Sequence, residues 1–75
     1  MAGLVGIERH GAGLSGLVLC RSEKRNALSI ALLDELCAAV KLLESDESSR
    51  VVLLRGEGPI FSAGLDLHEA AEESL

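Results

Sequence analysis

Apolar residues near the start of the chain fall into two short runs separated by a glycine-rich triplet. The first run, over residues 4–7, alternates loosely between apolar and other positions, whereas the second, over residues 17–20, is continuously apolar. The triplet Gly11-Ala12-Gly13 lies between them. Two such runs joined by a short glycine-containing segment are typical of a β-hairpin. Because the second run has no polar alternation, we expect its strand to be covered on both faces.

From Leu28 onward the apolar period becomes that of a helix. Apolar side chains recur at spacings of three and four, and most charged side chains fall on the opposite side, which predicts an amphipathic helix. The apolar positions are Leu28, Leu32, Leu33, Leu36, Val40 and Leu43. Ser29 is a candidate N-cap, since its hydroxyl can accept a free N–H of the first turn. The polar residues 45–49 predict the loop that ends the helix.

Four consecutive aliphatic residues, Val51 to Leu54, predict a buried strand after this loop. A strand, a helix and a second strand in this order form a βαβ crossover, so we expect parallel pairing with a right-handed connection. Residues 60–64 then form a short apolar loop, and a further helix begins near Asp66. The predicted fold class is α/β, with a hairpin, a crossover helix, a parallel strand and the start of a second helix.

Length and charge limit the number of domains and the classes of partner that the chain could have. The 75 residues suffice for one small domain, and a domain of this size buries only ~60% of the surface that its unfolded chain exposes. The formal charge is −5 and the basic residues form no continuous block, which argues against a nucleic-acid partner. No apolar stretch approaches the ~18 residues of a membrane-spanning helix, so no membrane partner is expected.

The residue types that bind metals are scattered along the chain. Cys20 and Cys37 do not have a zinc-binding spacing, and two cysteines do not make a disulfide framework. We expect both to be reduced, small core residues, in a protein of the cytoplasm or of the mitochondrial or peroxisomal matrix. His10 and His68 are isolated from other ligand types, so no metal site is expected.

Residues 11–16 match the dinucleotide-binding pattern Gly-x-Gly-x-x-Gly. That motif requires its last glycine to open a helix whose N-terminus faces a pyrophosphate. Here the continuously apolar residues 17–20 follow instead, and these predict a strand. We therefore interpret the glycines as a hairpin turn.

Residues 61–66, Phe-Ser-Ala-Gly-Leu-Asp, place small side chains directly before a predicted helix. Their backbone can approach a ligand closely, and free N–H groups could hold an anion or a developing oxyanion. A purely structural turn between a strand and a helix explains the same composition. In either case Asp66 is expected to cap the helix.

Four segments of the chain follow one another in a recognisable order and spacing. They are Arg21 to Ser29, the Leu-Leu-Asp-Glu-Leu helix at 32–36, Arg50 to Gly56 and Phe61 to Leu67. Together they resemble the N-terminal part of the enoyl-CoA hydratase/isomerase family, the crotonases, over about residues 5–69. The resemblance implies that residues 1–75 are a single partial domain, the first portion of a crotonase-type ββα spiral. The family's catalytic carboxylates and second oxyanion donor come from segments that this chain does not contain.

The resemblance also implies roles for individual residues. The substrate would be an acyl-CoA thioester, with no separate cofactor and no metal. The Leu65 backbone N–H matches one of two donors to the thioester oxygen, and Lys24 and Arg25 match positions where basic side chains meet CoA. Further CoA contacts are implied for Ala27, Ala63, Gly64, Asp66 and Leu67. Members of the family often form trimers or hexamers.

Two hypotheses of function follow from these residues. In the first, the chain is the acyl-CoA-binding part of an enzyme that stabilises a thioester enolate through backbone N–H donors, with negligible turnover by the 75-residue chain itself. In the second, it is a non-catalytic truncated form that binds CoA weakly or associates with full-length subunits. A third possibility is that the sequence is part of a longer gene product. Glu69, Glu72 and Glu73 match no catalytic position, and we expect them to form a solvated helix face.

Overall fold

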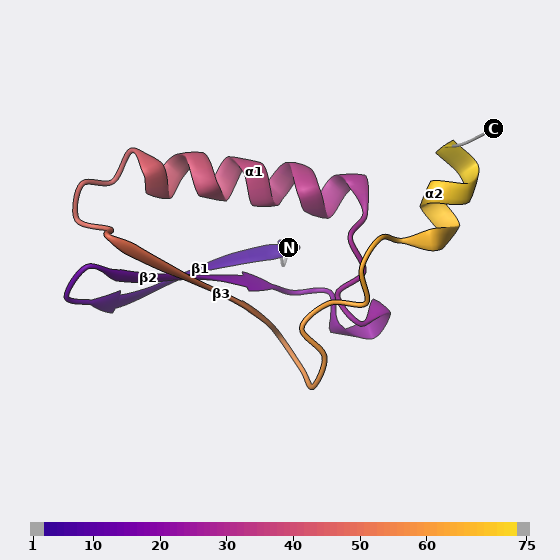
Figure 1. The fold of residues 1–75 in the computed structure, drawn as a ribbon, viewed down its shortest axis with the longest axis horizontal. Helices are drawn as coiled ribbons and strands as arrows, with labels where there is room; N and C mark the ends of the chain where they lie inside the picture. The colour runs from indigo at the N-terminus through magenta and orange to yellow at the C-terminus, as the bar shows by residue number, and fades with distance from the viewer. Residues whose placement is uncertain (1–2, 74–75) are drawn as a thin grey trace.

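The computed structural model describes residues 3–73 as one helix packed on a three-stranded sheet, followed by a short second helix (Figure 1). The elements are β1 (Val5–Gly11), β2 (Leu14–Leu19), the 3₁₀ helix η1 (Ser22–Lys24), α1 (Ile30–Glu44), β3 (Val51–Gly56) and α2 (Leu67–Glu73). The strand order is β1-β2-β3, and α1 lies along one face of this sheet. The predicted order of hairpin, crossover helix, parallel strand and second helix is confirmed.

Strands β1 and β2 form the predicted antiparallel hairpin, with Val5 opposite Leu19 and Arg9 opposite Ser15. The register shifts between Arg9 and Gly11, next to the turn. All three turn residues 11–13 have positive φ, between 53° and 84°. Glycine adopts such angles without steric cost, which explains why two of the three positions carry it. The glycine pattern is therefore a hairpin turn, and no helix follows it.

The N-terminus of α1 is capped as predicted. The Ser29 hydroxyl oxygen accepts a hydrogen bond from the Leu32 N–H at 3.1 Å. Leu32, Ala39 and Leu43 are buried on the side of the helix that faces the sheet. At the N-terminal edge of the sheet, the Glu35 carboxylate accepts the N–H of Leu4 at 2.8 Å. This bond ties the start of the chain to α1.

Strand β3 pairs in parallel with β2, as predicted, from Leu14 opposite Val51 to Leu19 opposite Gly56. The predicted burial of β3 is wrong, because the residues of Val51 to Leu54 are 43–60% exposed. In the sheet order β3 is an edge strand, and α1 packs against β1 and β2 rather than over it. The central strand β2 behaves as expected, with Leu17, Val18 and Leu19 at most 5% exposed.

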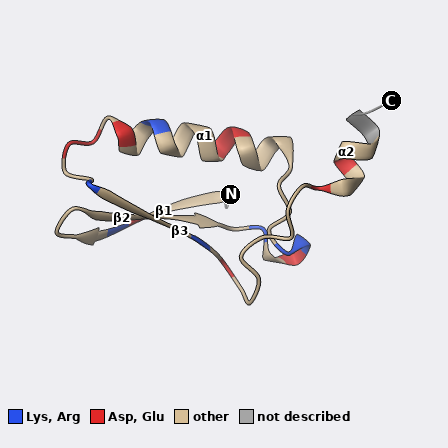
Figure 2. Ribbon diagram, viewed as in Figure 1, with Lys and Arg blue, Asp and Glu red and all other residues tan. Residues whose placement is uncertain are grey.

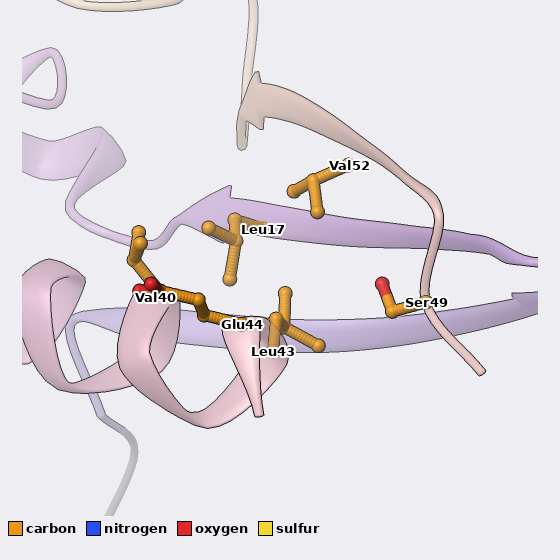
Figure 3. Close-up of a pocket in the computed structure, with 6 residues that line it drawn as sticks. All are labelled: Leu17, Val40, Leu43, Glu44, Ser49 and Val52. Carbon is orange, nitrogen blue, oxygen red and sulfur yellow. The ribbon is translucent and has the colours of Figure 1, made fainter. Parts of the chain in front are cut away.

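An apolar hollow of about 320 Å³ lies where α1 fails to reach β3 (Figure 3). Leu17 and Val52 point into it from the sheet, and Val40 and Leu43 line it from the helix. Glu44 and Ser49 complete its lining. The partial exposure of β3 and this hollow are two aspects of one fact, that the sheet is wider than the single helix covering it.

The two cysteines are free thiols, but only one of them is close to the core. Cys20 is half-buried at the end of β2, whereas Cys37 is exposed on α1. The prediction that both are core residues is wrong for Cys37, because the neighbouring Leu36 takes the sheet-facing position and the next residue of a helix is turned by about 100°. Over residues 3–73 no helix is long and apolar enough to span a bilayer.

Candidate functional site

Two loops run side by side beyond the end of the sheet, one over residues 25–28 and the other over 62–66. The Leu28 N–H donates to the Gly64 carbonyl at 2.8 Å, and the Asp66 N–H donates to the Leu28 carbonyl at 3.0 Å. These two bonds form one parallel β-bridge. The loop before α1 therefore fixes the backbone of the loop before α2, although they are about forty residues apart in the sequence.

The bridge turns the main chain of Leu65 away from residues 25–28. In a parallel bridge one residue makes both bonds, and here that residue is Leu28, so the N–H of its partner Leu65 points to the other side. Within residues 3–73 the Leu65 N–H donates to no protein atom. Its side chain is 58% exposed. The residue predicted to supply a backbone donor thus has that donor free.

Asn26 joins the two loops through its side chain. It is completely buried and has a left-handed φ of 55°. Its Oδ1 accepts the Arg21 N–H at 2.8 Å, and its Nδ2 donates to the carbonyls of Glu57 and Ile60, both at 2.9 Å. The amide therefore uses its oxygen and its NH₂ group for bonds within the protein. Asn26 was not among the predicted site residues, and its burial is visible only once the loops are folded together.

Ser62 continues this connection into the second loop. Its hydroxyl donates to the Asn26 carbonyl at 2.8 Å and accepts the Gly64 N–H at 3.0 Å. Gly64 has a φ of 86°, a value that side-chain-bearing residues adopt at a cost. The hydroxyl is therefore occupied as both donor and acceptor.

A hollow of about 580 Å³ opens beside the two loops and η1. It brings together all of the predicted site residues except Gly64, which lies on an apolar hollow on another side of the loop. The predicted residues that line it are Lys24, Arg25, Ala27, Ala63, Leu65, Asp66 and Leu67. The remaining lining residues are Arg21, Glu23 and His68. Figure 2 shows basic and acidic positions side by side around η1, and further basic positions on α1 and along the strands.

The Asp66 carboxylate is committed to two partners at the edge of this hollow. Its Oδ2 lies 2.8 Å from Nη1 of Arg21, which also donates to the Ala27 carbonyl at 2.9 Å. Its Oδ1 accepts the Glu69 N–H at 3.2 Å, which confirms the predicted cap of α2. The bond from Arg21, followed by the Glu69 N–H, lowers the pKa of Asp66 below its ordinary value. Arg21 is a second residue that the sequence prediction of the site left out.

Glu69 does not belong to a solvated face, contrary to the prediction. Its carboxylate accepts the N–H of Ile30, the first residue of α1, and the residue is half-buried. Helix N-termini leave N–H groups without intrahelical partners, and a nearby carboxylate satisfies one of them. The side chains of Glu72 and Glu73, predicted to lie on the same face, are outside the described residues.

Comparison with known proteins identifies the family to which the chain is similar. The sequence model of the enoyl-CoA hydratase/isomerase family matches residues 9–75. The chain belongs to that family. It is 36% identical over 61 residues to the enoyl-CoA hydratase AFT3-1 of Alternaria alternata, a match that covers 81% of this chain and 21% of that protein. It is 45% identical over 60 residues to 4-chlorobenzoyl coenzyme A dehalogenase-2 of an Arthrobacter species, covering 80% and 22% of the two chains.

The family's solved structures contain the same fold. An enoyl-CoA hydratase/isomerase from Xanthobacter autotrophicus Py2 superposes with a TM-score of 0.87 at 32% sequence identity. That match covers 99% of this chain and 27% of the other. The α/β assignment and the resemblance to the N-terminal part of the crotonase fold are therefore confirmed. The chain spans about a fifth of the length of the curated relatives it matches.

Proposed function

We propose that the chain binds the CoA portion of an acyl-CoA thioester in the hollow beside η1 and offers the Leu65 N–H to the thioester oxygen. The observation that carries this proposal is the free Leu65 N–H at the lining of a hollow that also holds Lys24 and Arg25. Family membership supports the same substrate class, since the relatives named above are an enoyl-CoA hydratase and a coenzyme A dehalogenase.

Electrostatics favours an anionic ligand part at the η1 side of the hollow. Lys24 and Arg25 are exposed, and neither ammonium nor guanidinium makes an ion pair within the described residues. Phosphates of CoA carry the charge that would satisfy both. Main-chain groups of Ala63 and Leu67, which line the same hollow, supply polar contacts for the remainder of the CoA portion.

A backbone donor suits the chemistry of a thioester enolate. As negative charge develops on the thioester oxygen, an N–H that is already oriented stabilises it without reorganising and without titrating. Loss of one such donor typically costs ~10²–10³ in rate. Gly64 allows the backbone to take its left-handed turn just before Leu65, and the bridge to Leu28 holds it there.

We propose binding without turnover by these 75 residues, because the two carboxylates at the start of α2 are already used within the protein. Asp66 has a lowered pKa and is held by Arg21, so it is a poor proton donor near neutral pH. Glu69 is used by the first turn of α1. Proton transfer would then require groups other than these two.

Isothermal titration with CoA tests the proposed binding. We expect the Lys24→Ala/Arg25→Ala double variant to bind CoA about 3- to 30-fold more weakly than the native chain, the effect of two exposed ion pairs. Lys41→Ala is the matched control, because Lys41 is exposed on α1 away from the hollow and should leave the affinity unchanged. No heat with the native chain, or equal losses in both variants, would contradict the proposal. An assay with a short enoyl-CoA should give no hydration or isomerisation above the buffer rate.

A second function is supported by the exposure of β3. In this alternative the chain is non-catalytic and associates with full-length members of its family through Val51 to Leu54, which are 43–60% exposed. An edge strand with apolar side chains readily adds a partner. Size-exclusion chromatography with a full-length relative distinguishes the two, since co-elution supports the association and separate elution removes it.

A further inference from the structure

The segment that presents the Leu65 N–H is held by side chains that do not line the hollow. Neither Asn26 nor Ser62 contributes to the hollow beside η1. Asn26 is completely buried, and Ser62 is half-buried. The Asn26 side chain bonds to the backbone that precedes this segment, at Glu57 and Ile60, and the Ser62 hydroxyl bonds to the Gly64 N–H within it. Their bonds therefore act on the geometry of the loop rather than on a ligand.

The bonds form a continuous path to the peptide next to the donor. The Asn26 amide anchors the path by donating to Glu57 and Ile60 at 2.9 Å, which fixes the approach to the loop. The Asn26 carbonyl then accepts the Ser62 hydroxyl at 2.8 Å, and the Ser62 oxygen accepts the Gly64 N–H at 3.0 Å. The next N–H along the chain is that of Leu65.

Without this path, the main chain holds the Gly64–Leu65 peptide only through the bridge to Leu28. The bridge to Leu28 holds the Gly64 carbonyl and the Asp66 N–H. The Gly64 carbonyl and the Leu65 N–H belong to the same planar peptide, so the bridge already holds the donor's peptide at its carbonyl. The remaining freedom of that peptide lies in the dihedral angles of Gly64, the least restricted residue type. The bond from the Gly64 N–H to Ser62 limits that freedom. Because the strength of an oxyanion donor depends on its preorganised direction, the restraint bears directly on the proposed chemistry.

We propose that Asn26 and Ser62 are positioning residues, a buried clamp that orients the Leu65 N–H toward the thioester oxygen. The proposal rests on the proposed function, because it assigns the clamp a role only if Leu65 is the donor. The clamp acts through Leu65 and Gly64 and makes no contact with substrate. Its loss should therefore weaken the bond to the thioester oxygen while leaving the affinity for CoA in place.

Ser62→Ala is the sharper variant, since it removes the hydroxyl and leaves the buried Asn26 amide bonds intact. Ser49→Ala is its matched control, because Ser49 is also half-buried and its hydroxyl also makes a side-chain bond, to Ser15 at 3.0 Å. Ser49 lies in the connection between α1 and β3, at the opposite end of the molecule from the loop (Figure 1). Ser62→Thr keeps a hydroxyl and serves as the rescue variant.

The chain is titrated with butyryl-CoA carrying ¹³C at the thioester carbonyl, and NMR follows the backbone amides together with that carbon. In the native chain we expect the amides of Lys24, Arg25 and Ala27 to report binding, and the Leu65 amide and the labelled carbonyl to shift downfield together. In Ser62→Ala the amides of Lys24 and Arg25 should report an affinity within about twofold of native, because the side chains of these two residues make no bond to Ser62. The Leu65 and carbonyl shifts should fall by about half or more, since the donor's peptide is then held by the bridge to Leu28 alone. Ser49→Ala should behave as native, and Ser62→Thr should restore the shifts.

Amide hydrogen exchange without ligand tests the clamp independently of the proposed binding of CoA. Loss of one hydrogen bond should speed exchange at Gly64 by about 3- to 10-fold in Ser62→Ala and leave it unchanged in Ser49→Ala. If no amide of the native chain responds to butyryl-CoA, the proposed function fails, and the exchange rates still show whether the clamp holds the loop. Native Leu65 and carbonyl shifts in Ser62→Ala, or an unchanged Gly64 exchange rate, would overturn the clamp while leaving the proposed function standing.

Discussion

Replacing Asn26 by alanine should remove a large share of the stability of this chain. The change deletes three part-buried hydrogen bonds and leaves the Arg21 N–H and the carbonyls of Glu57 and Ile60 without that partner. At about 1 kcal/mol of net stability for each bond, the loss is about 3 kcal/mol. Alanine at a φ of 55° adds about 1–2 kcal/mol, because asparagine tolerates the left-handed region better.

We therefore expect the free energy of unfolding to fall by about 4 kcal/mol, the sum of these bond and backbone contributions. A chain of this length has about 4–11 kcal/mol in total at typical values per residue. The substitution should therefore leave about 0–7 kcal/mol, and at the low end of this range the protein lies close to its unfolding midpoint in water. Few single changes have so large an effect, and those that do usually leave buried polar groups unpaired.

Urea denaturation followed by far-ultraviolet circular dichroism measures this change. The chain has no tryptophan or tyrosine, so the helix signal of α1 is the natural probe. Asn26→Gly separates the contributions, because it loses the same bonds but adopts the left-handed angle freely, and it should recover about 1 kcal/mol of the alanine loss. Ser48→Ala, an exposed loop change, should stay within about 0.5 kcal/mol of native. A loss below about 1 kcal/mol in Asn26→Ala would refute the assignment of Asn26 as the anchor of the two loops.

Three further changes have defined outcomes. Gly56→Ala should cost about 3 kcal/mol or prevent folding, because an added Cβ would lie 2.3 Å from the Phe61 carbonyl oxygen; urea denaturation measures it. Asp66→Asn keeps a capping side chain but loses the charge paired with Arg21. The lowered pKa of Asp66 stabilises the native chain above the ordinary value of 3.8 and is lost as the pH falls through the folded pKa, so thermal unfolding of the variant should depend less on pH below about 4. Leu53→Lys should reduce co-elution with a full-length relative in size-exclusion chromatography, and unchanged co-elution would show that β3 is not the contact.

The elements of the fold could be predicted because their signals are local. The period of the leucines in α1 is set by the geometry of a single helix, and Ser29, directly before that helix, caps an N–H three residues further along the chain. The parallel pairing of β3 follows from the order of the elements and the length of the crossover. The exposure of β3 could not be predicted in the same way. Four aliphatic residues in a row indicate a strand suited to apolar contacts on both faces. The sequence pattern does not show whether other parts of the 75 residues supply those contacts.

The site could be predicted only in part, because its connections span long distances in the sequence. The small residues 62–64 indicated a loop directly before a helix, and the structure has that loop before α2. Asn26, however, acts on carbonyls 31 and 34 residues away, and Glu69 caps a helix that begins 39 residues earlier. A polar residue beside Arg25 has no local feature that distinguishes burial from exposure. Its left-handed φ and its bonds exist only when both loops are in place.

When a site relies on a backbone donor, the residues that determine it are not the residue that carries the donor. Almost any residue at position 65 supplies an N–H, so the leucine side chain, which is 58% exposed, says little about the proposed chemistry. What the donor requires is a backbone that points it away from the bridge to Leu28 and keeps it there. That requirement falls on Gly64, which allows the turn, and on Asn26 and Ser62, which restrict it. The residues most informative about such a donor are therefore those that hold its peptide, and they need not touch the substrate.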